Sequence, residues 1–207
     1  MISLTVLPWI AIVVLGYALG NLNGALMISR LMMHDDVRSH GSGNAGLTNF
    51  FRTYGGIQSV LVIVIDMGKC MLACYLAALI LPEHALTAKA LAGAATVLGH
   101  SYPAVSGFRG GKGILSGSAV ALMIDWRIYV IIMTIFGVTV ALSKYVSLGS
   151  ILATSAFGIC MLIFYWGNWP ALVLTIGTAL FVIARHHKNI GRLLHGTESK
   201  LTFRKKK

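Results

Sequence analysis

The sequence predicts an all-α polytopic membrane protein with about seven transmembrane helices and three polar, glycine-rich loops on the cytoplasmic side. The first observation behind this prediction is composition. Of 207 residues, 57% are hydrophobic and only 11% are charged, and the mean hydropathy is +0.79, whereas an ordinary soluble domain carries about 25% charged residues. The other two observations are long apolar runs and a one-sided distribution of basic residues. Together they indicate a single integral-membrane domain over residues 1–207, with a basic C-terminal tail at about 193–207.

Three apolar runs are long enough to cross a bilayer. A spanning helix needs about 20 mostly apolar residues, and the runs 6–28, 57–81 and 146–166 meet that length. Shorter apolar runs could be tilted spans or segments that enter the membrane and return. These shorter runs are 85–99, 113–124, 128–142 and 171–184. Hydropathy alone therefore leaves five spans and seven spans open.

The positions of the basic residues favour seven spans. If all the runs cross, one side collects nearly all of the 17 Lys and Arg residues, and the other side has only Arg127. Lys69 and Lys89 lie inside apolar runs. The positive-inside rule then places the N-terminus outside and the basic loops and C-terminus in the cytoplasm. The net charge of +11 is explained by orientation and by anionic lipid headgroups, so nucleic acid is not an expected partner.

The first polar connection, residues 31–56, has the composition of an anion-binding loop. Its closely spaced glycines allow successive backbone N–H groups to point into one concavity. Neutral donors and a bidentate cation accompany these glycines: Ser42, Asn44, Thr48, Asn49 and Arg52. A helix that starts just after the loop would add the positive end of its dipole. The loop therefore predicts phosphate binding, although Gly, Ser and Asn are also common in ordinary turns.

The second polar connection, residues 99–113, contains His100 and a glycine-rich stretch, Gly110-Gly111-Lys112-Gly113. This stretch is similar to a fragment of a Walker P-loop, but the earlier glycine and the following Ser or Thr are missing. A nucleoside triphosphatase is therefore disfavoured. Glycines that permit a close approach, together with the compact charge of Lys112, still suit a phosphate. The alternative is a flexible turn that carries a positive-inside residue.

The third polar patch combines residues 144–150, which include Ser147, with residues 185–192. His186 and Asn189 in the second segment lie one helical turn apart. No carboxylate or cysteine joins the histidines at ligand spacing. Cys70, Cys74 and Cys160 lie in apolar runs and are expected to be buried small hydrophobes. We therefore expect no metal and no other cofactor.

One ionisable pair lies inside a predicted span. Asp66 and Lys69 are three residues apart, so on a helix they face the same way and can pair. Intramembrane charges are functional by default, but a structural bridge to a neighbouring helix would explain this pair equally well. Both interpretations stay open at this point.

The three patches, in their order along the chain, resemble one family, the bacterial membrane acyl-phosphate:glycerol-3-phosphate acyltransferases called PlsY. The resemblance extends to Asp66 with Lys69 and to residues 147–150. The main matching residues are 41–44 with Thr48, Asn49 and Arg52; 99–100 with Pro103, 107–108 and 110–113; and 185–186 with 189–190, 192–193 and 196–198.

The resemblance implies transfer of a fatty acyl group from acyl phosphate to the 1-hydroxyl of sn-glycerol 3-phosphate. The products would be phosphate and 1-acylglycerol 3-phosphate, which is lysophosphatidic acid, in the first acylation of phospholipid synthesis. Acyl phosphate and glycerol 3-phosphate are then the expected substrates, and an acyl-phosphate-producing enzyme is an expected partner. The protein would lie in the bacterial cytoplasmic membrane with its active site facing the cytoplasm.

The resemblance also implies roles for the candidate site residues. The catalytic candidates, which would position glycerol 3-phosphate or its reacting hydroxyl, are His100, His186 and Asn189. The phosphate-binding candidates are Ser42, Asn44, Thr48, Asn49, Arg52, Gly110, Gly111, Lys112 and Ser147. Either a histidine or the acyl phosphate itself could accept the proton.

Two further expectations follow from missing motifs and from a rival function. The chain has no Gly-x-Ser-x-Gly elbow, so we expect no covalent acyl-enzyme. The rival function is a membrane transporter of a phosphorylated or anionic solute, which could present the same donors on glycine-broken helices. A transporter would place them near the membrane midplane, whereas here they cluster at one face.

Overall fold

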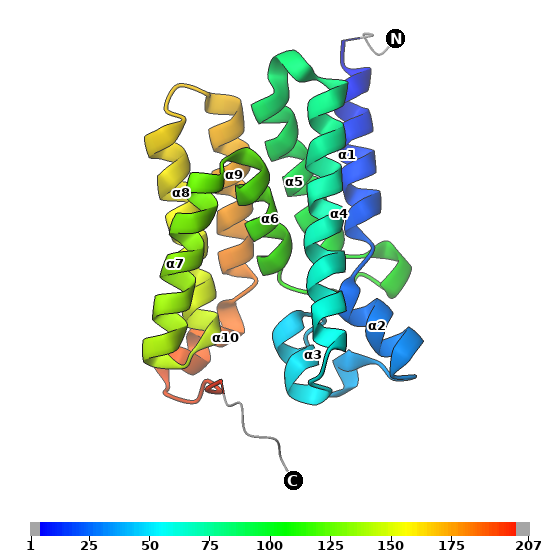
Figure 1. Cartoon of the computed structure of the whole chain (residues 1–207), viewed down its shortest axis with the longest axis vertical. Coiled ribbons are helices and arrows are strands. Elements are labelled where there is room, and N and C mark those ends of the chain that lie inside the picture. Colours follow the sequence, from blue (N-terminus) through cyan, green and yellow to red (C-terminus); the bar gives the residue numbers. More distant parts are fainter. Residues whose placement is uncertain (1–4, 202–207) are drawn as a thin grey trace.

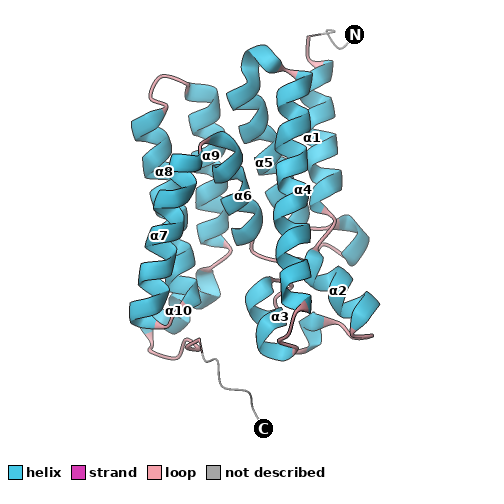
Figure 2. Cartoon of the chain, viewed as in Figure 1, coloured by secondary structure: helices cyan, strands magenta, loops and turns pink. Residues whose placement is uncertain are grey.

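Every predicted apolar run is helical in the structure, a computed structural model that describes residues 5–201 (Figure 2). Three short 3-10 turns, η1 (Val37–Ser39), η2 (Pro82–His84) and η3 (Ala104–Ser106), lie in the connections. Part of the predicted basic tail, residues 202–207, lies outside the described residues. The α-helices are α1 (Leu7–Gly20), α2 (Gly24–Met32), α3 (Leu47–Thr53), α4 (Gln58–Ile80), α5 (Ala85–Ser101), α6 (Ile114–Ile124), α7 (Trp126–Ser143), α8 (Val146–Phe164), α9 (Trp169–Ala184) and α10 (His187–Leu194).

Four helical stretches of the described chain are long and apolar enough to cross a membrane. They are Leu7–Met32, Gln58–Ile80, Trp126–Ser143 and Val146–Phe164. The pair α9 and α10, bent by 54°, makes a fifth if it is counted as one span. Helix α6 has 11 residues, which at 1.5 Å per residue is roughly 16 Å, about half the thickness of the hydrocarbon core. The predicted all-helical architecture with several spans is confirmed, and the count of seven stays a prediction.

The long helices run side by side and alternate in direction along the chain (Figure 1). Helices α2, α3 and α10 gather at one end of the bundle, together with the first and third polar connections. The connection between α5 and α6 returns to the bundle toward the same end. We call this the polar end. The alternation therefore brings three segments that are far apart in the sequence into one region.

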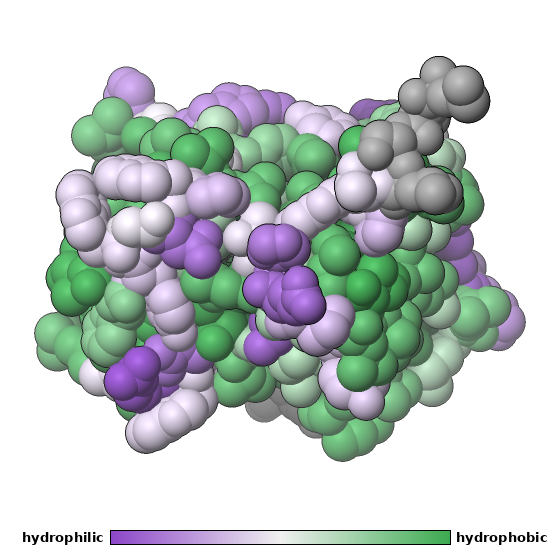
Figure 3. Space-filling model, turned by 90° about the horizontal axis from the view of Figure 1, so that it is seen from above, coloured by the Kyte–Doolittle hydropathy of each residue, from purple (hydrophilic) through white to green (hydrophobic). Residues whose placement is uncertain are grey.

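The outer surface of the bundle suits a lipid environment. Large apolar side chains are exposed on the sides of the long helices, such as Ile163 on α8 and Val173 on α9, which are 70% and 69% exposed. In the view from the end opposite the polar end, hydrophilic residues lie across the end face and hydrophobic residues predominate around the sides (Figure 3). Contiguous exposed apolar surface of this kind is rare on soluble monomers, and it agrees with the apolar composition.

Helices α1 and α5 pack closely because small residues line their contact. A Cβ atom added to Gly16 would lie 2.9 Å from the carbonyl oxygen of Ala92, and one added to Gly20 would lie 2.8 Å from the Cα of Gly99. Such distances leave no room for a side chain. Small residues spaced four apart are typical of helices that pack against one another in membranes. The contact places the end of α5, and with it His100, beside the end of α1.

The first apolar run is not one continuous helix, because it breaks at residues 21–23 between α1 and α2. The side chain of Asn23 caps α2 by accepting a hydrogen bond from the Leu26 amide at 3.0 Å. Asn23 and Gly24, at the end of this break, are buried in the bundle, and buried polar groups need hydrogen-bond partners.

The buried pair Asp66–Lys69 of α4 satisfies these groups. The two side chains lie 2.8 Å apart, with side-chain exposures of 1% and 2%. Lys69 Nζ donates to the carbonyl oxygens of Gly20, at 3.3 Å, and Leu22, at 2.6 Å, and Asp66 Oδ1 accepts from the Gly24 amide at 3.0 Å. Among the two interpretations of this pair, the structure supports the structural bridge to a neighbouring helix.

Candidate active site

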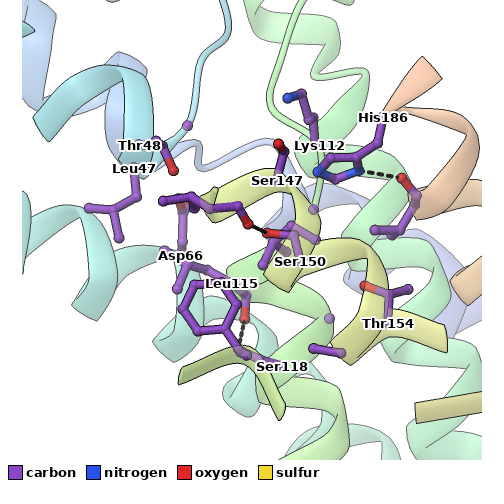
Figure 4. A pocket seen from close by; sticks show the side chains of 18 of the residues that line it. Leu47, Thr48, Asp66, Lys112, Leu115, Ser118, Ser147, Ser150, Thr154 and His186 are labelled. Atoms are coloured by element: carbon purple, nitrogen blue, oxygen red, sulfur yellow. Dashed lines mark hydrogen bonds between the residues drawn. The ribbon is translucent and has the colours of Figure 1, made fainter. Parts of the chain in front are cut away.

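A cavity of about 910 Å³ opens between the helices toward the polar end. We call it the main cavity. One part of its wall is polar and comes from the loop before α3, from Lys112 and from the ends of α8 and α9. The rest comes from α4, α6, α7, α8 and α9 and is mostly apolar, with side chains such as Ile132, Phe136 and Phe157 beside a few hydroxyls such as those of Ser118 and Thr154. In Figure 4, Lys112, Ser147 and His186 lie together on one side, and Leu47 and Thr48 lie across from them. A cavity of this kind can hold a molecule with an anionic head and a long apolar tail.

The structure brings nearly all predicted site residues together at this cavity. Gly110 does not line it but lines a neighbouring cavity, and Gly111 lines neither. The predicted residues that line the main cavity are Ser42, Asn44, Thr48, Asn49, Arg52, His100, Lys112, Ser147, His186 and Asn189.

The neighbouring cavity has a volume of about 730 Å³ and a mostly basic lining, and we call it the basic chamber. It is formed by the η1 region, by the segment before α6 and by the start of α10. Its wall includes Arg38, Arg109, Arg185 and Lys188. None of the four was among the predicted site residues, although Arg185 and Lys188 belong to the third polar patch and residues 185–186 to the segments that resemble the family. Five residues line both cavities: Ser42, Asn44, Lys112, Asn189 and Arg192. The two cavities therefore meet at a shared polar wall.

The first loop is shaped by Asn49. Its side-chain oxygen accepts from the Ser42 amide at 3.0 Å, and its side-chain nitrogen donates to the carbonyl oxygens of Val37, at 2.9 Å, and His40, at 3.0 Å. Gly41 has a φ of +55°, in the left-handed region that favours glycine. Because the protons of the Asn49 amide are already donated, Asn49 shapes the loop around a ligand rather than donating to one.

Other donors of this loop are free to bind a ligand. Within residues 5–201, the hydroxyls of Ser42 and Thr48 and the side-chain amide of Asn44 have no protein hydrogen-bond partner, although all three residues line the main cavity. Arg52 is exposed at the rim and uses one guanidinium nitrogen to donate to the Ser199 carbonyl at 3.0 Å. Its remaining donors suit an anion at the mouth of the cavity.

The second loop uses its glycines for close packing. The amide of Gly110 donates to the Ser101 carbonyl at 3.1 Å, and the amide of Gly111 donates to the His100 carbonyl at 3.2 Å. A Cβ at Gly111 would overlap the His100 ring and lie 2.7 Å from the Ala45 carbonyl oxygen. Since both amides are engaged, these two glycines position Lys112 and do not themselves present N–H groups to phosphate.

Arg38 clamps the first loop to the second. Its guanidinium donates to the carbonyl oxygens of Ser106, at 2.9 Å, and Arg109, at 3.1 Å, and it pairs with Asp36 at 2.7 Å. Sequence reasoning missed this residue. The only signal was an acid two residues before a base in a polar loop, which is also an ordinary surface pattern.

Glu198 is a second residue that sequence reasoning did not place in the site. It accepts hydrogen bonds from Ser147 Oγ at 2.7 Å, from Asn189 Nδ2 at 2.7 Å and from Arg192 Nε at 2.6 Å. Asn189 in turn accepts from Lys112 Nζ at 2.5 Å. One carboxylate therefore orients the side chains from α8 and α10 and, through Asn189, the Lys112 ammonium. Because it takes the only hydroxyl proton of Ser147, the prediction that Ser147 donates to phosphate is wrong for this arrangement.

The surroundings shift the pKa values of Lys112 and Glu198, which form the two ends of this chain of contacts. Burial lowers the pKa of Lys112 to about 8, and the nearby guanidinium groups of Arg192, Arg185 and Arg52 act in the same direction against an opposing effect of Glu198. Burial alone would raise the pKa of Glu198, but its three hydrogen bonds outweigh burial and hold the pKa below its usual value.

The two predicted histidines have different surroundings. His186 Nδ1 lies 2.8 Å from the Val182 carbonyl oxygen, and a carbonyl can only accept, so Nδ1 carries the proton and Nε2 of the neutral ring remains an acceptor. His100 Nδ1 lies 2.9 Å from Lys69 Nζ and 3.3 Å from Asp66 Oδ1. His186 therefore keeps a nitrogen available to a substrate, whereas His100 belongs to the buried network at the α1–α2 break.

The sequence is similar to a known protein family. Residues 10–196 match the profile of the family described as glycerol-3-phosphate acyltransferase. A glycerol-3-phosphate acyltransferase of Geobacillus kaustophilus is 37% identical over 193 residues, covering 93% of this chain and 95% of its own. One of Clostridioides difficile is 35% identical over 203 residues, covering 97% and 98%.

Two solved structures are also similar. Both are crystal structures of PlsY (YgiH), described as an integral membrane glycerol 3-phosphate acyltransferase. The glycerol 3-phosphate form superposes with a TM-score of 0.87 at 30% identity, covering 94% of this chain and 96% of that one. The lysophosphatidic acid form has a TM-score of 0.83 at 28% identity, covering 94% and 95%.

The pKa of Lys112 predicts a pH dependence for binding of a phosphate monoester. The ammonium loses its proton as pH rises through about 8, whereas a free lysine does so near 10.4, and the monoester is already doubly charged at pH 7. Calorimetric titration should therefore show affinity falling above about pH 8. Lys112→Arg should keep its affinity to higher pH, because a guanidinium stays charged. Equal affinity of the wild-type protein at pH 7 and pH 9.5 would show that the charge of Lys112 does not contribute to binding the phosphate monoester.

Proposed function

The chain belongs to the glycerol-3-phosphate acyltransferase family, and we propose that it uses acyl phosphate to acylate the 1-hydroxyl of sn-glycerol 3-phosphate. It is a multi-pass membrane acyltransferase of glycerol 3-phosphate. The donor, the position acylated and the roles of the residues belong to the proposal. The products would be lysophosphatidic acid and inorganic phosphate, in the first acylation of phospholipid synthesis.

The observation that carries the proposal is the junction of the two cavities. The main cavity has an apolar part for an acyl chain, and its polar wall is shared with a chamber lined by basic residues. Both proposed substrates carry phosphate, and only the donor carries a long chain. A donor whose phosphate lies at the shared wall would place its acyl carbon at the boundary between the polar and apolar parts of the main cavity.

The shared wall suits the phosphate of the donor. Ser42 and Asn44 present free polar groups there, and Lys112 adds a partly buried charge held by Asn189. Charges placed where a leaving group develops negative charge stabilise the transition state in a site that excludes water. Lys112 would therefore stabilise the phosphate as its bond to the acyl carbon breaks.

The other end of the polar wall suits glycerol 3-phosphate. Thr48, Arg52 and Ser147 line only the main cavity, and they come from α3 and α8 on the two sides of its mouth. Thr48 and Arg52 can donate to the phosphate, whereas Ser147, whose only hydroxyl proton goes to Glu198, can only accept, for example from a glycerol hydroxyl. His186 also lines this cavity with Nε2 available as an acceptor. It could orient the reacting hydroxyl or take its proton, and the phosphate of the donor could also take that proton.

Catalysis would then come from proximity and from charge stabilisation. Acyl phosphate is an activated anhydride, so a hydroxyl held beside it can attack without an enzyme nucleophile. The hydroxyl oxygen forms the new ester bond, and the departing phosphate takes the electron pair of the broken bond. We expect no acyl-enzyme and no need for a metal or another cofactor.

The orientation in the membrane is also proposed. Seven crossing segments, with the N-terminus outside, would place the polar end in the cytoplasm, in agreement with the distribution of Lys and Arg. Glycerol 3-phosphate would then enter from the cytoplasm, and an acyl-phosphate-producing enzyme at the same membrane surface could supply the donor. The whole of residues 1–207 would act as one domain.

The donor assignment is tested by supplying donors separately. Purified protein in detergent should form lysophosphatidic acid from glycerol 3-phosphate with acyl phosphate, and not with acyl-CoA or acyl carrier protein, in the absence of ATP and added metal. With acyl phosphate, Lys112→Ala should lower kcat/KM by roughly 30-fold to several thousand-fold, because truncating a buried charged contact costs about 2 to 5 kcal/mol. The loss of kcat/KM in Arg52→Ala should lie at the lower end of this range, since Arg52 is exposed.

Arg127→Ala provides the control, because Arg127 lies near the start of α7, lines neither cavity and pairs with Asp125. It should change kcat/KM less than twofold. An absolute requirement for acyl-CoA, or a Lys112→Ala variant as active as the Arg127→Ala control, would refute the proposed chemistry.

The orientation is tested by labelling single cysteines introduced at exposed positions. In a parent in which Cys70, Cys74 and Cys160 are replaced by alanine, Ser39→Cys, Arg109→Cys and Thr197→Cys should react with an impermeant reagent only from the cytoplasmic side. Glu83→Cys, in the turn at the opposite end, should react only from outside. Reaction of any of the first three from outside would refute a single cytoplasmic site.

A further inference from the structure

The basic chamber holds cations that the proposed chemistry does not use. Arg109 and Lys188 are exposed residues that line only this chamber. Among residues 5–201, neither side chain has a salt-bridge or hydrogen-bond partner. Two other cations of the wall, Arg38 and Arg192, are engaged, since Arg38 pairs with Asp36 and Arg192 pairs with Glu198. Arg109, from the segment before α6, and Lys188, from α10, are therefore two cations without partners in the wall of the chamber.

A third cation of this wall has an unused donor. Arg185 donates to the Tyr102 hydroxyl at 3.2 Å and to the Gly111 carbonyl at 3.2 Å, and its guanidinium lies 4.8 Å from the centre of the Tyr102 ring. Its Nε atom is buried and has no hydrogen-bond partner in the described chain. Buried donors are rarely left without a partner, so this position agrees with a wall that receives an anion.

The lining of the chamber indicates a small, water-soluble occupant. Phe108 is its only large apolar side chain, and the glycines and uncharged polar residues of its wall are Ser39, Ser42, Gly43, Asn44, Gly110 and Asn189. An acyl chain would find almost no apolar contact there. The main cavity, by contrast, has the long apolar wall that a lipid product needs. The two cavities therefore separate an anion without a tail from an anion with one.

We propose that the basic chamber is the release path and transient binding site of inorganic phosphate split from the acyl donor. The inference rests on the proposed function. In that reaction the glycerol hydroxyl oxygen bonds to the acyl carbon, the bond from that carbon to the phosphate oxygen breaks, and the phosphate leaves with the electron pair. The hydroxyl proton ends on the phosphate, directly or through His186.

The geometry favours this exit over the mouth of the main cavity. Phosphate leaving the acyl carbon starts at the shared wall, beside Ser42 and Lys112, and the basic chamber begins on the other side of the same residues. The lysophosphatidic acid just formed still occupies the main cavity. Arg109 and Lys188 then attract the phosphate away from the wall before water carries it off, since opposite charges steer small ions along a cleft.

The test measures inhibition by the product. Inorganic phosphate is added to the acyl phosphate reaction of the full-length protein, and its inhibition constant is measured for the wild type and for the double variant Arg109→Gln with Lys188→Gln. The constant should rise roughly 5- to 30-fold in the double variant, as expected for loss of two exposed ion pairs. The KM values for acyl phosphate and glycerol 3-phosphate should stay within about twofold.

Lys144→Gln is the matched control. Lys144 is also an exposed cation near the polar end, beside residue 201, but it lines neither cavity. The Lys144→Gln substitution removes one charge from the same region and should leave the phosphate inhibition constant unchanged. Wild-type elution in size-exclusion chromatography and an unchanged melting temperature report that all variants are folded.

Three results would overturn the inference. The phosphate inhibition constant could be the same in the double variant as in the wild type, or phosphate could fail to inhibit the wild-type enzyme at all. The KM for glycerol 3-phosphate could instead rise in parallel with the inhibition constant, which would make the chamber the entry route of that substrate. Failure of the proposed function is a separate result, in which the wild-type protein releases no phosphate from acyl phosphate when glycerol 3-phosphate is present.

Discussion

The buried ion pair of Asp66 and Lys69 is the contact on which the arrangement of the site depends. The polar end requires α1 to stop inside the bundle and α2 to restart there, which leaves backbone groups unsatisfied where water is absent. Lys69 binds the carbonyl oxygens at the end of α1, and Asp66 binds the first amide of α2. A buried pair is a weak source of net stability, but removing one partner leaves an uncompensated charge and costs about 3 to 5 kcal/mol. The pair therefore determines where the chain turns more than it stabilises the fold.

The same pair is linked to both loops of the site through His100, whose Nδ1 lies 2.9 Å from Lys69 Nζ and 3.5 Å from Asn23 Nδ2. Asn23, at the break, donates to the Ala45 carbonyl of the first loop at 3.1 Å, and Lys69 contacts His100, whose ring packs against Gly111 of the second loop. Arg38 clamps the two loops together on the outer side. Glu198 plays the corresponding part for the third patch, because it orients the side chains of α8 and α10. The groups proposed to bind phosphate, which come from distant segments, are thus held in place by polar contacts within the protein, which is the condition for electrostatic catalysis.

Much of this could be predicted from the sequence, because the signals were local. The apolar run 57–81 corresponds to α4 (Gln58–Ile80), and the polar loops contain the residues that line the main cavity. The break between α1 and α2 could not be predicted, because the mean hydropathy of a long run hardly changes when three residues leave the helix. The hydrogen bonds that satisfy the backbone at the break come from α4, which the local sequence does not reveal. Residue type alone could not show that Asn49 shapes the first loop and that Gly111 packs against His100, because Asn and Gly in a polar loop are equally typical of phosphate binding. Glu198 stands in the segment 196–198 that resembles the family, but its contact with Ser147 of α8 joins segments far apart in the chain, as does the basic chamber, and residue type alone reports neither.

The central claim, that the buried pair holds the two loops of the site, is tested most directly by hydrogen exchange of backbone amides in Lys69→Met, with Lys89→Met as the control. Lys89 also lies on a long helix but has no salt-bridge partner among the described residues. In Lys69→Met, amides of residues 41–46 and 110–112 should exchange roughly tenfold faster or more, because loss of the pair makes local opening easier. The turn at residues 82–84 should be unaffected, and Lys89→Met should match the wild type in all three regions. Faster exchange confined to residues 20–24, with both loops as protected as in the wild type, would contradict the account.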